Sequence, residues 1–167
     1  MKFELKRLSP EALHGALEKA HLYRLLNEPT EAESICRDIL DVDPDNQEAL
    51  VALLLALTDQ FHTDAAAAFG EARKVIERIT HPYAHAYYAG IVYERRAKAL
   101  HQSVPGTGPR AYEWLREAMT WYEKAERLRP AGNDDALLRW NACARLLMRD
   151  QRLVPAIEER GEPLFLE

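Results

Sequence analysis

The sequence predicts an all-α protein built from stacked helical hairpins. Ala32, Cys36 and Ile39 are four and three residues apart, a spacing that places them on one face of a helix, and Pro44 ends that helix. The same spacing returns later in the chain, in Ala118, Tyr122, Ala125 and Pro130. Between these two copies lies a segment, residues 47–58, that is apolar nearly all round, as expected of a helix packed on several sides.

A small residue stands three positions before a tyrosine upstream of each copy. The pairs are Ala20 with Tyr23 and Gly90 with Tyr93. Two helices approach closely at a small residue, and an aromatic side chain one turn later fills the gap beside the contact. Each unit is therefore expected to be a helical hairpin.

This pattern of a small residue, a tyrosine, an alanine-led helix and a closing proline resembles the tetratricopeptide repeat, whose period is about 34 residues. Tyr23 and Tyr93 are 70 residues apart, which leaves room for a degenerate middle repeat with Leu57 at the tyrosine position. The third repeat then has 16 extra residues between its helices. The resemblance implies a right-handed α-α superhelix, with a C-terminal capping helix and an extended tail.

The first repeat is expected over residues 13–46. Ser9 is the predicted N-cap of a helix that starts at Pro10 and continues to about Leu26. A turn over residues 27–31 leads to a second helix that ends at Val42, and residues 43–46 reverse the chain.

The second repeat is expected over residues 47–82 and the third over residues 83–132. In the second, Thr63 or Asp64 is the predicted cap of a helix that ends near Ile79. The third begins with an aromatic helix, residues 82–101, continues with a loop over residues 103–109, and ends with a helix over residues 112–128. A capping helix over residues 133–149 completes a repeat domain of residues 1–149, and residues 150–167 form a tail.

Composition limits the class of protein. At 167 residues the chain fits one domain, and a net charge of −5 argues against a nucleic-acid-binding protein. No apolar leader follows Met1, and the longest apolar run, residues 49–57, is too short to span a membrane, so we expect a cytoplasmic protein. Cys36 and Cys143 fall on predicted helix faces, which favours buried thiols over a disulfide.

The resemblance implies that the first helix of each repeat lines a concave groove. Eight positions carried over from the family form the predicted partner-binding site: Leu17, His21, Arg24, Val51, Leu55, Tyr87, Ile91 and Arg95. The same transfer brings Thr58 and Asp59 into the groove. Its apolar middle suits a peptide with two or three apolar anchors. The alternative is that these residues belong to the hydrophobic core and do not form a binding surface.

The sequence gives little support for a catalytic site or a metal site. His81 and His85, and likewise His14 and His21, are spaced to share a helix face, but no further ligand stands at a familiar spacing. No nucleophile elbow or zinc-protease motif occurs, so the expected function is non-catalytic, with no metal and no cofactor. The expected role is a scaffold or adaptor that binds a protein or peptide.

Two further expectations concern the C-terminal part of the chain. Leu164, Phe165 and Leu166 are an apolar end that we expect to dock, either in the groove of the same molecule or across a homodimer. The alternative function is that of an accessory to an enzyme or a nucleic-acid complex, through basic residues around residues 103–110 and near the end. These basic residues are Arg95, Arg96, Lys98, Arg110, Arg139, Arg145, Arg149 and Arg152.

Overall fold

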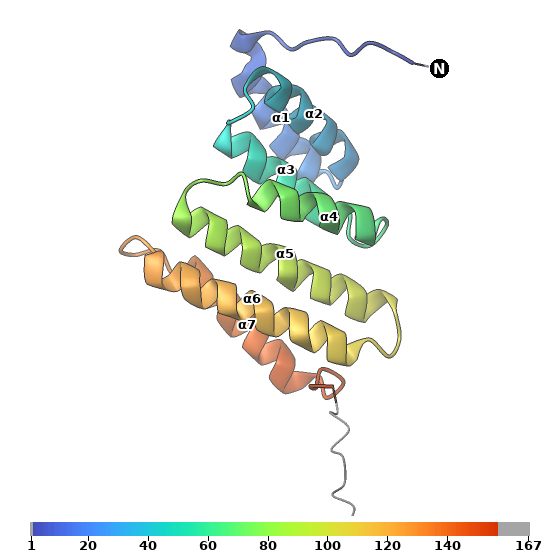
Figure 1. Cartoon of the computed structure of the whole chain (residues 1–167), viewed down its shortest axis with the longest axis vertical. Helices are drawn as coiled ribbons and strands as arrows, with labels where there is room; N and C mark the ends of the chain where they lie inside the picture. The colour runs from blue at the N-terminus through green and yellow to red at the C-terminus, as the bar shows by residue number, and fades with distance from the viewer. Residues whose placement is uncertain (1, 157–167) are drawn as a thin grey trace, which may run out of the picture.

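The computed structural model describes residues 2–156, and over this range all regular structure is helical. Seven α-helices follow one short 3-10 helix, Pro10–Ala12. The helices are α1 Leu13–Leu25, α2 Pro29–Val42, α3 Gln47–Asp59, α4 Ala65–Ile76, α5 Pro82–Ser103, α6 Gly108–Leu128 and α7 Asp135–Arg149. They succeed one another along the long axis of the molecule, from α1 at one end to α7 at the other (Figure 1). The predicted all-α class is confirmed.

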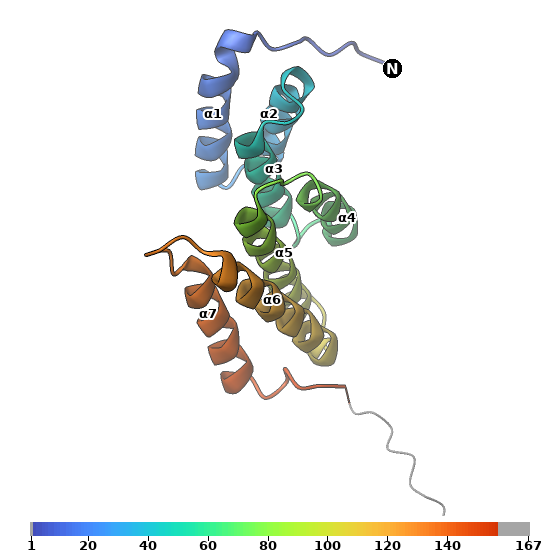
Figure 2. The ribbon, with the colours of Figure 1, turned by 60° about the vertical axis from the view of Figure 1, so that its left-hand side comes forward.

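Each helix packs against the next one in the chain, and α3 also contacts α1 and α5. Figure 2 shows α1 and α7 on one side of α3 and α5, and α4 on the opposite side. The predicted central helix, α3, therefore has neighbours on several sides. Eleven buried residues of this core cluster lie in α3, just after α3 or in α4: Ala49, Leu50, Ala52, Leu53, Leu54, Leu57, Phe61, Ala68, Ala72, Val75 and Ile76.

The repeated spacing marks buried helix faces. Ala32, Cys36 and Ile39 are at most 1% exposed, and Ala118, Tyr122 and Ala125 are fully buried. In α4, Ala68, Ala72 and Val75 have the same spacing and are also in the core. The spacing therefore identified the inward faces of α2 and α6 correctly.

The 16 extra residues of the third unit lengthen its two helices instead of forming a long loop. Helices α5 and α6 contain 22 and 21 residues, whereas α1 to α4 contain 12 to 14. Only residues 104–107 separate α5 from α6, so the predicted loop over 103–109 is too long. Helix α6 begins at Gly108, one turn before the predicted start, because Pro109 stands in its first turn, where the missing N–H costs no hydrogen bond.

Helices α5 and α6 approach closely at Gly90. A Cβ atom at this position would lie 2.5 Å from the ring of Tyr122, which is fully buried. The prediction of close contact at a small residue is therefore confirmed here. Of the two tyrosines, Tyr93 packs edge-on against Phe69, with ring centroids 5.9 Å apart, whereas Tyr23 is 37% exposed.

Some predicted helix ends are also wrong. Ser9 makes no capping hydrogen bond through its side chain, and the chain forms the 3-10 turn before α1 begins. Asp64 precedes α4 without a side-chain cap, and α4 ends at Ile76, three residues before the predicted end. Asn46 does cap α3, since its Oδ1 accepts a hydrogen bond of 2.9 Å from the backbone N–H of Ala49.

Both cysteines are free thiols in the core. Each is fully buried, and burial raises the pKa of Cys36 to about 11 and that of Cys143 to about 12. A buried protonated thiol is a poor nucleophile.

We expect both thiols to react with a disulfide reagent at pH 8 at least about 100-fold more slowly in the native protein than in denaturant, because reaction requires opening of the core. The unfolded thiols ionise near pH 9, whereas the folded ones stay protonated to about pH 11. The unfolded state therefore loses protons first, and the free energy of unfolding should fall as the pH rises above 9. Immediate labelling of either cysteine in the native protein would contradict the predicted slow reaction of the thiols.

Residues 150–156 run along the turn between α5 and α6. Asp150 accepts a 2.8 Å hydrogen bond from the His101 ring, and Leu153 is buried. A Cβ atom at Gly108 would lie 2.0 Å from the Arg152 carbonyl oxygen, so this glycine permits the close approach. The expected docking of Leu164, Phe165 and Leu166 lies outside the described residues.

Among the described helices, none combines the length and the apolar composition that crossing a membrane requires.

Candidate functional site

Helices α1 and α3 run side by side in the same direction and leave a cleft at each end of their seam. Leu13 and Leu17, at the start of α1, line one cleft together with the first residues of α3. Arg24, at the end of α1, lines the other together with Asp59, the last residue of α3. Residues 13, 17 and 24 share one helix face, so the two clefts belong to one surface.

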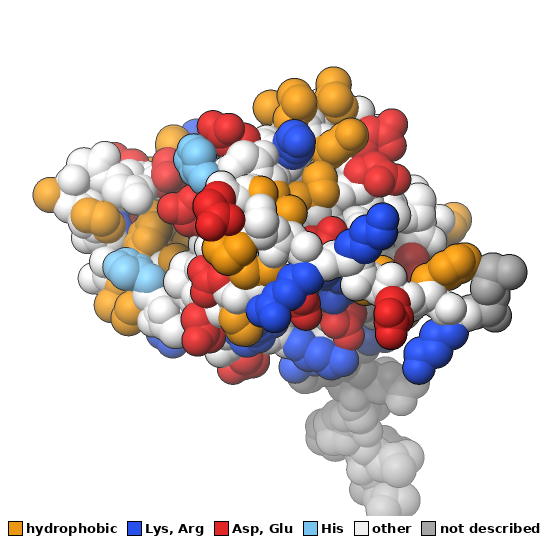
Figure 3. Space-filling view, turned by 90° about the horizontal axis from the view of Figure 1, so that it is seen from above, with side chains coloured by type: hydrophobic (Ala, Val, Ile, Leu, Met, Phe, Trp, Pro, Cys, Tyr) orange, Lys and Arg blue, Asp and Glu red, His pale blue; other side chains and the backbone are white. Residues whose placement is uncertain are grey.

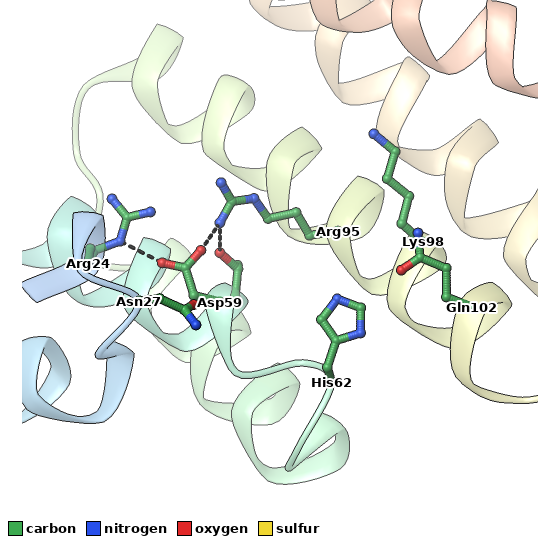
Figure 4. A pocket seen from close by; sticks show the side chains of 8 residues that line it. Arg24, Asn27, Asp59, His62, Arg95, Lys98 and Gln102 are labelled. Carbon is green, nitrogen blue, oxygen red and sulfur yellow. Dashed lines mark hydrogen bonds and ion pairs between the residues drawn. The ribbon is translucent and has the colours of Figure 1, made fainter.

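The cleft at the end of α3, here called the polar cleft, is organised around a carboxylate between two arginines (Figure 4). Arg24 Nε donates a 2.8 Å hydrogen bond to Asp59 Oδ2, and Arg95 Nη1 donates a 2.5 Å hydrogen bond to Oδ1 of the same carboxylate. Arg95 Nη1 also donates to Thr58 Oγ1, at 2.7 Å. The Asp59 carboxylate thus links α1 to α5 across the end of α3.

The two arginines keep donors for a ligand. The side chains of Arg24 and Arg95 are 18% and 29% exposed, and each guanidinium carries five N–H groups, of which the contacts with Asp59 and Thr58 use only part. The cleft has a volume of about 380 Å³. Its remaining lining residues are Asn27, His62, Lys98 and Gln102. Two arginines therefore face one carboxylate, while Lys98 pairs with Glu94, and the remaining excess of positive charge favours an anionic ligand group.

The cleft at the start of α3, here called the leucine cleft, has a volume of about 440 Å³. Leu13 and Leu17 form its apolar wall, and the remaining lining residues are His14, Asn46, Gln47 and Glu48. Leu17 is 8% exposed, so it forms the floor of the cleft. An apolar side chain of moderate size fits this wall, and the polar residues form a rim around it.

The predicted groove residues are only partly at the surface. His21 is exposed between the two clefts, and Val51 and Leu55 are half-buried beside the seam. Tyr87 is half-buried and stacks on Tyr83, with ring centroids 5.8 Å apart. Ile91 is 4% exposed, so its side chain belongs to the core. Of the eight predicted positions, Arg24 and Arg95 meet in one cleft and Leu17 lines the other.

Next to the polar cleft, α5 holds a buried carboxylate that the sequence did not single out. Glu94 is 1% exposed and accepts a 2.5 Å hydrogen bond from the Tyr122 hydroxyl. Lys98 and Arg139 also pair with this carboxylate. Burial, followed by the Glu94 charge, raises the pKa of Tyr122 far above its usual range, so the hydroxyl remains a donor. This cluster ties α5 to α6 and α7.

Several residues of the basic series are engaged within the molecule. The Arg96 guanidinium lies over the Trp114 ring at 5.1 Å, and Arg110 lies over the same ring at 5.2 Å. Arg152 pairs with Asp150. Acidic and basic side chains are also interspersed over the face seen from the α1 end (Figure 3). Part of the basic series is therefore engaged in internal contacts, whereas Arg145 and Arg149 are exposed on α7.

The histidines take ordinary structural roles. His81 caps α5 through its Nδ1, which accepts a 3.4 Å hydrogen bond from the Ala84 N–H. His85 packs edge-on against Trp121, with ring centroids 5.7 Å apart. His14 lies 3.5 Å from the Glu18 carboxylate on the exposed side of α1.

Sequence reasoning did not identify four residues of the polar cleft as one group. Lys98 appeared only in the basic series, and no spacing connected Asn27, His62 or Gln102 with Arg24. His62 comes from the turn between α3 and α4, where no helical period applies. The one available signal was the acidic Asp59 that ends an otherwise apolar helix.

The sequence matches no known protein-family model, and no curated protein or solved structure matches it.

Proposed function

We propose that this chain is a non-catalytic scaffold of tetratricopeptide-like repeats that holds an extended segment of a protein partner along the seam between α1 and α3. One observation carries the proposal. The two clefts lie at opposite ends of the same seam and differ in chemistry, one polar with excess positive charge and the other walled by leucines.

The distance between the clefts sets the spacing in the partner. Helix α3 contains 13 residues, and at about 1.5 Å per residue the clefts at its two ends are about 18 Å apart. An extended chain covers about 3.3 Å per residue, so five or six residues span that distance. The favoured ligand therefore carries an acidic residue and a large apolar residue five or six positions apart.

Both anchors contribute modestly. A charge-assisted hydrogen bond to a partly buried arginine stabilises by about 1.5–3 kcal/mol, and burial of a leucine side chain by about 1.5–3 kcal/mol. Ordering of the peptide offsets part of this gain. We therefore expect a dissociation constant on the order of 0.1–1 mM, which is appropriate for a reversible adaptor.

The first test uses a synthetic hexapeptide with glutamate at one end, leucine at the other and serine or threonine between them. We expect Arg24→Glu to weaken its binding at least tenfold, because the variant replaces a donor of the polar cleft by a like charge. Binding is measured by fluorescence anisotropy in a chain that also carries Leu164→Ser and Phe165→Ser, so that no apolar tail competes.

The matched control is Arg145→Glu, which makes the same charge change at an exposed position of α7. It should leave the affinity within about twofold. A peptide with the leucine replaced by serine should also bind at least tenfold more weakly. Equal binding by the Arg24→Glu and Arg145→Glu variants would refute the proposed site.

A further inference from the structure

Two arginines share one tryptophan ring where α4, α5 and α6 meet. The guanidinium carbon of Arg96, on α5, lies 5.1 Å from the centroid of the Trp114 ring and 5.7 Å from that of Phe69. The guanidinium carbon of Arg110, on α6, lies 5.2 Å from the same Trp114 ring. None of these four residues lines the polar cleft or the leucine cleft, so this arginine–tryptophan cluster is a separate feature of the surface.

The cluster holds two positive charges close together. Both guanidinium carbons lie near one ring centroid and are therefore at most about 10 Å apart, a distance over which charges still interact at 0.1 M salt. Within residues 2–156, the ion pairs formed by arginines do not include Arg96 or Arg110. Burial and then the Arg110 charge lower the pKa of Arg96, so the two cations repel each other.

The contacts with the rings leave hydrogen-bond donors available. Attraction between a cation and a ring acts through the electron density of the ring and does not satisfy the N–H donors in the plane of a guanidinium. Arg96 Nε is buried and donates to no group in the part of the chain that the structure describes. Arg110 is exposed at the start of α6. Arg96 is thus a donor held in place by two rings, and Arg110 is a donor that can turn towards a ligand.

We propose that Arg96 and Arg110 form a binding site for a single phosphoryl group, carried by a phosphorylated serine or threonine of a protein partner. A phosphoryl group has a charge of about −1.5 to −2 and three acceptor oxygens, so it can accept from two guanidinium forks and offset their repulsion. A carboxylate has one charge and two oxygens, which match one fork. The first turn of α6, where Arg110 lies, adds the positive end of a helix dipole.

The surroundings favour an isolated phosphoryl group over a nucleic-acid backbone. Glu113 and Glu117 are exposed on α6 close to Trp114 in the chain, and the whole chain has a net charge of −5. Successive phosphates of a polyanion would meet these carboxylates, whereas one group between two arginines does not. The half-buried rings of Phe69 and Trp114 offer an apolar surface to the residue beside the phosphorylated one, which favours a protein segment over inorganic phosphate.

The test uses a blocked peptide of alanine, phosphoserine, leucine and alanine at low salt. Binding is followed through the indole N–H signal of Trp114 in two-dimensional NMR spectra of the full chain. We expect the peptide to shift this signal with a dissociation constant on the order of 1 mM, and the unphosphorylated peptide to leave it unchanged. The indole groups of Trp121 and Trp140 donate to Glu117 and Glu123, and their signals should shift much less.

Two variants address the two arginines. Arg110→Gln should weaken binding of the phosphorylated peptide at least about fivefold, because it removes a charged donor. Arg96→Lys should weaken it at least about threefold, because lysine keeps the charge but lacks the planar fork. Arg145→Gln, at an exposed position of α7, is the control and should bind like the unmodified chain. Arg110 is exposed, so its variant remains informative even if circular dichroism shows that Arg96→Lys disturbs the helices.

Four results would overturn the inference. An unshifted Trp114 signal, or equal binding by Arg110→Gln and Arg145→Gln, would remove the site. Inorganic phosphate that binds as tightly as the peptide would remove the protein segment as the source of the phosphoryl group. A single-stranded oligonucleotide that binds the same arginines more tightly than the peptide would identify a nucleic-acid site instead. None of these results bears on the seam between α1 and α3, which shares no residue with the cluster.

Discussion

Replacement of Glu94 by leucine should lower the free energy of unfolding by about 3 kcal/mol, within the usual range for removal of one partner of a buried ion pair. Glu94 is 1% exposed and is contacted by Tyr122, Lys98 and Arg139. The variant leaves the fully buried Tyr122 hydroxyl without its acceptor. Urea denaturation followed by circular dichroism measures the loss.

The contribution of the hydroxyl can be separated from that of the cations. Lys98 and Arg139 have side chains 37% and 38% exposed, so they can turn to water when the carboxylate is removed. The Tyr122 hydroxyl is fully buried and cannot turn to water. The free energy of unfolding of a Glu94→Leu, Tyr122→Phe chain should therefore be about 1–2 kcal/mol higher than that of Glu94→Leu alone. Glu113→Leu, at an exposed position of α6, is the control and should change stability by less than about 0.5 kcal/mol. A Glu94→Leu chain as stable as this control would show that the cluster contributes nothing to the fold.

Gly90→Ala should destabilise the protein by about 3 kcal/mol, against the usual direction of this substitution in a helix. Alanine in place of glycine ordinarily stabilises a helix interior by about 0.5–1 kcal/mol. Here the new Cβ atom would lie 2.5–2.9 Å from three ring atoms of Tyr122, so α5 and α6 must separate or the ring must leave its hydrogen bond with Glu94. Thermal and urea unfolding measure the effect.

Two other glycines provide the comparison. At Gly15 in α1 and Gly70 in α4, an added Cβ atom would meet no other atom within 4 Å, so alanine there should stabilise by about 0.5–1 kcal/mol. In a Tyr122→Leu background, which removes the ring, Gly90→Ala should cost much less, and the two substitutions should be non-additive. If Gly90→Ala stabilised the protein as much as Gly15→Ala, the result would contradict the close packing of α5 on α6.

Sequence reasoning succeeded where one local rule decides the structure. The spacing of Ala32, Cys36 and Ile39 follows the helical period, and all three are buried in α2. It failed at the start of α6, where Gly108 and Pro109 were interpreted as helix breakers. Proline breaks a helix interior but is well suited to its first turn, and the sequence does not show in which of the two places it will stand.

The candidate site was predictable only in part. Arg24 and Arg95 were expected in the groove, and they line one cleft. Asp59 was also expected in the groove, but its contact with both arginines depends on how three helix axes are placed relative to one another, which no local spacing determines. Helical spacing alone also could not assign Ile91 to the core or the surface. Its side chain is buried because α5 has neighbouring helices on both sides.

Adjacent side chains on α5 belong to different halves of the molecule. Glu94 pairs with groups on α6 and α7, whereas the next residue, Arg95, pairs with the last residue of α3. A twist of α5 about its own axis would break both sets of contacts together. These contacts hold α5 in one rotational position. A ligand that draws Arg95 away from Asp59 would therefore also act on the contacts of the neighbouring Glu94.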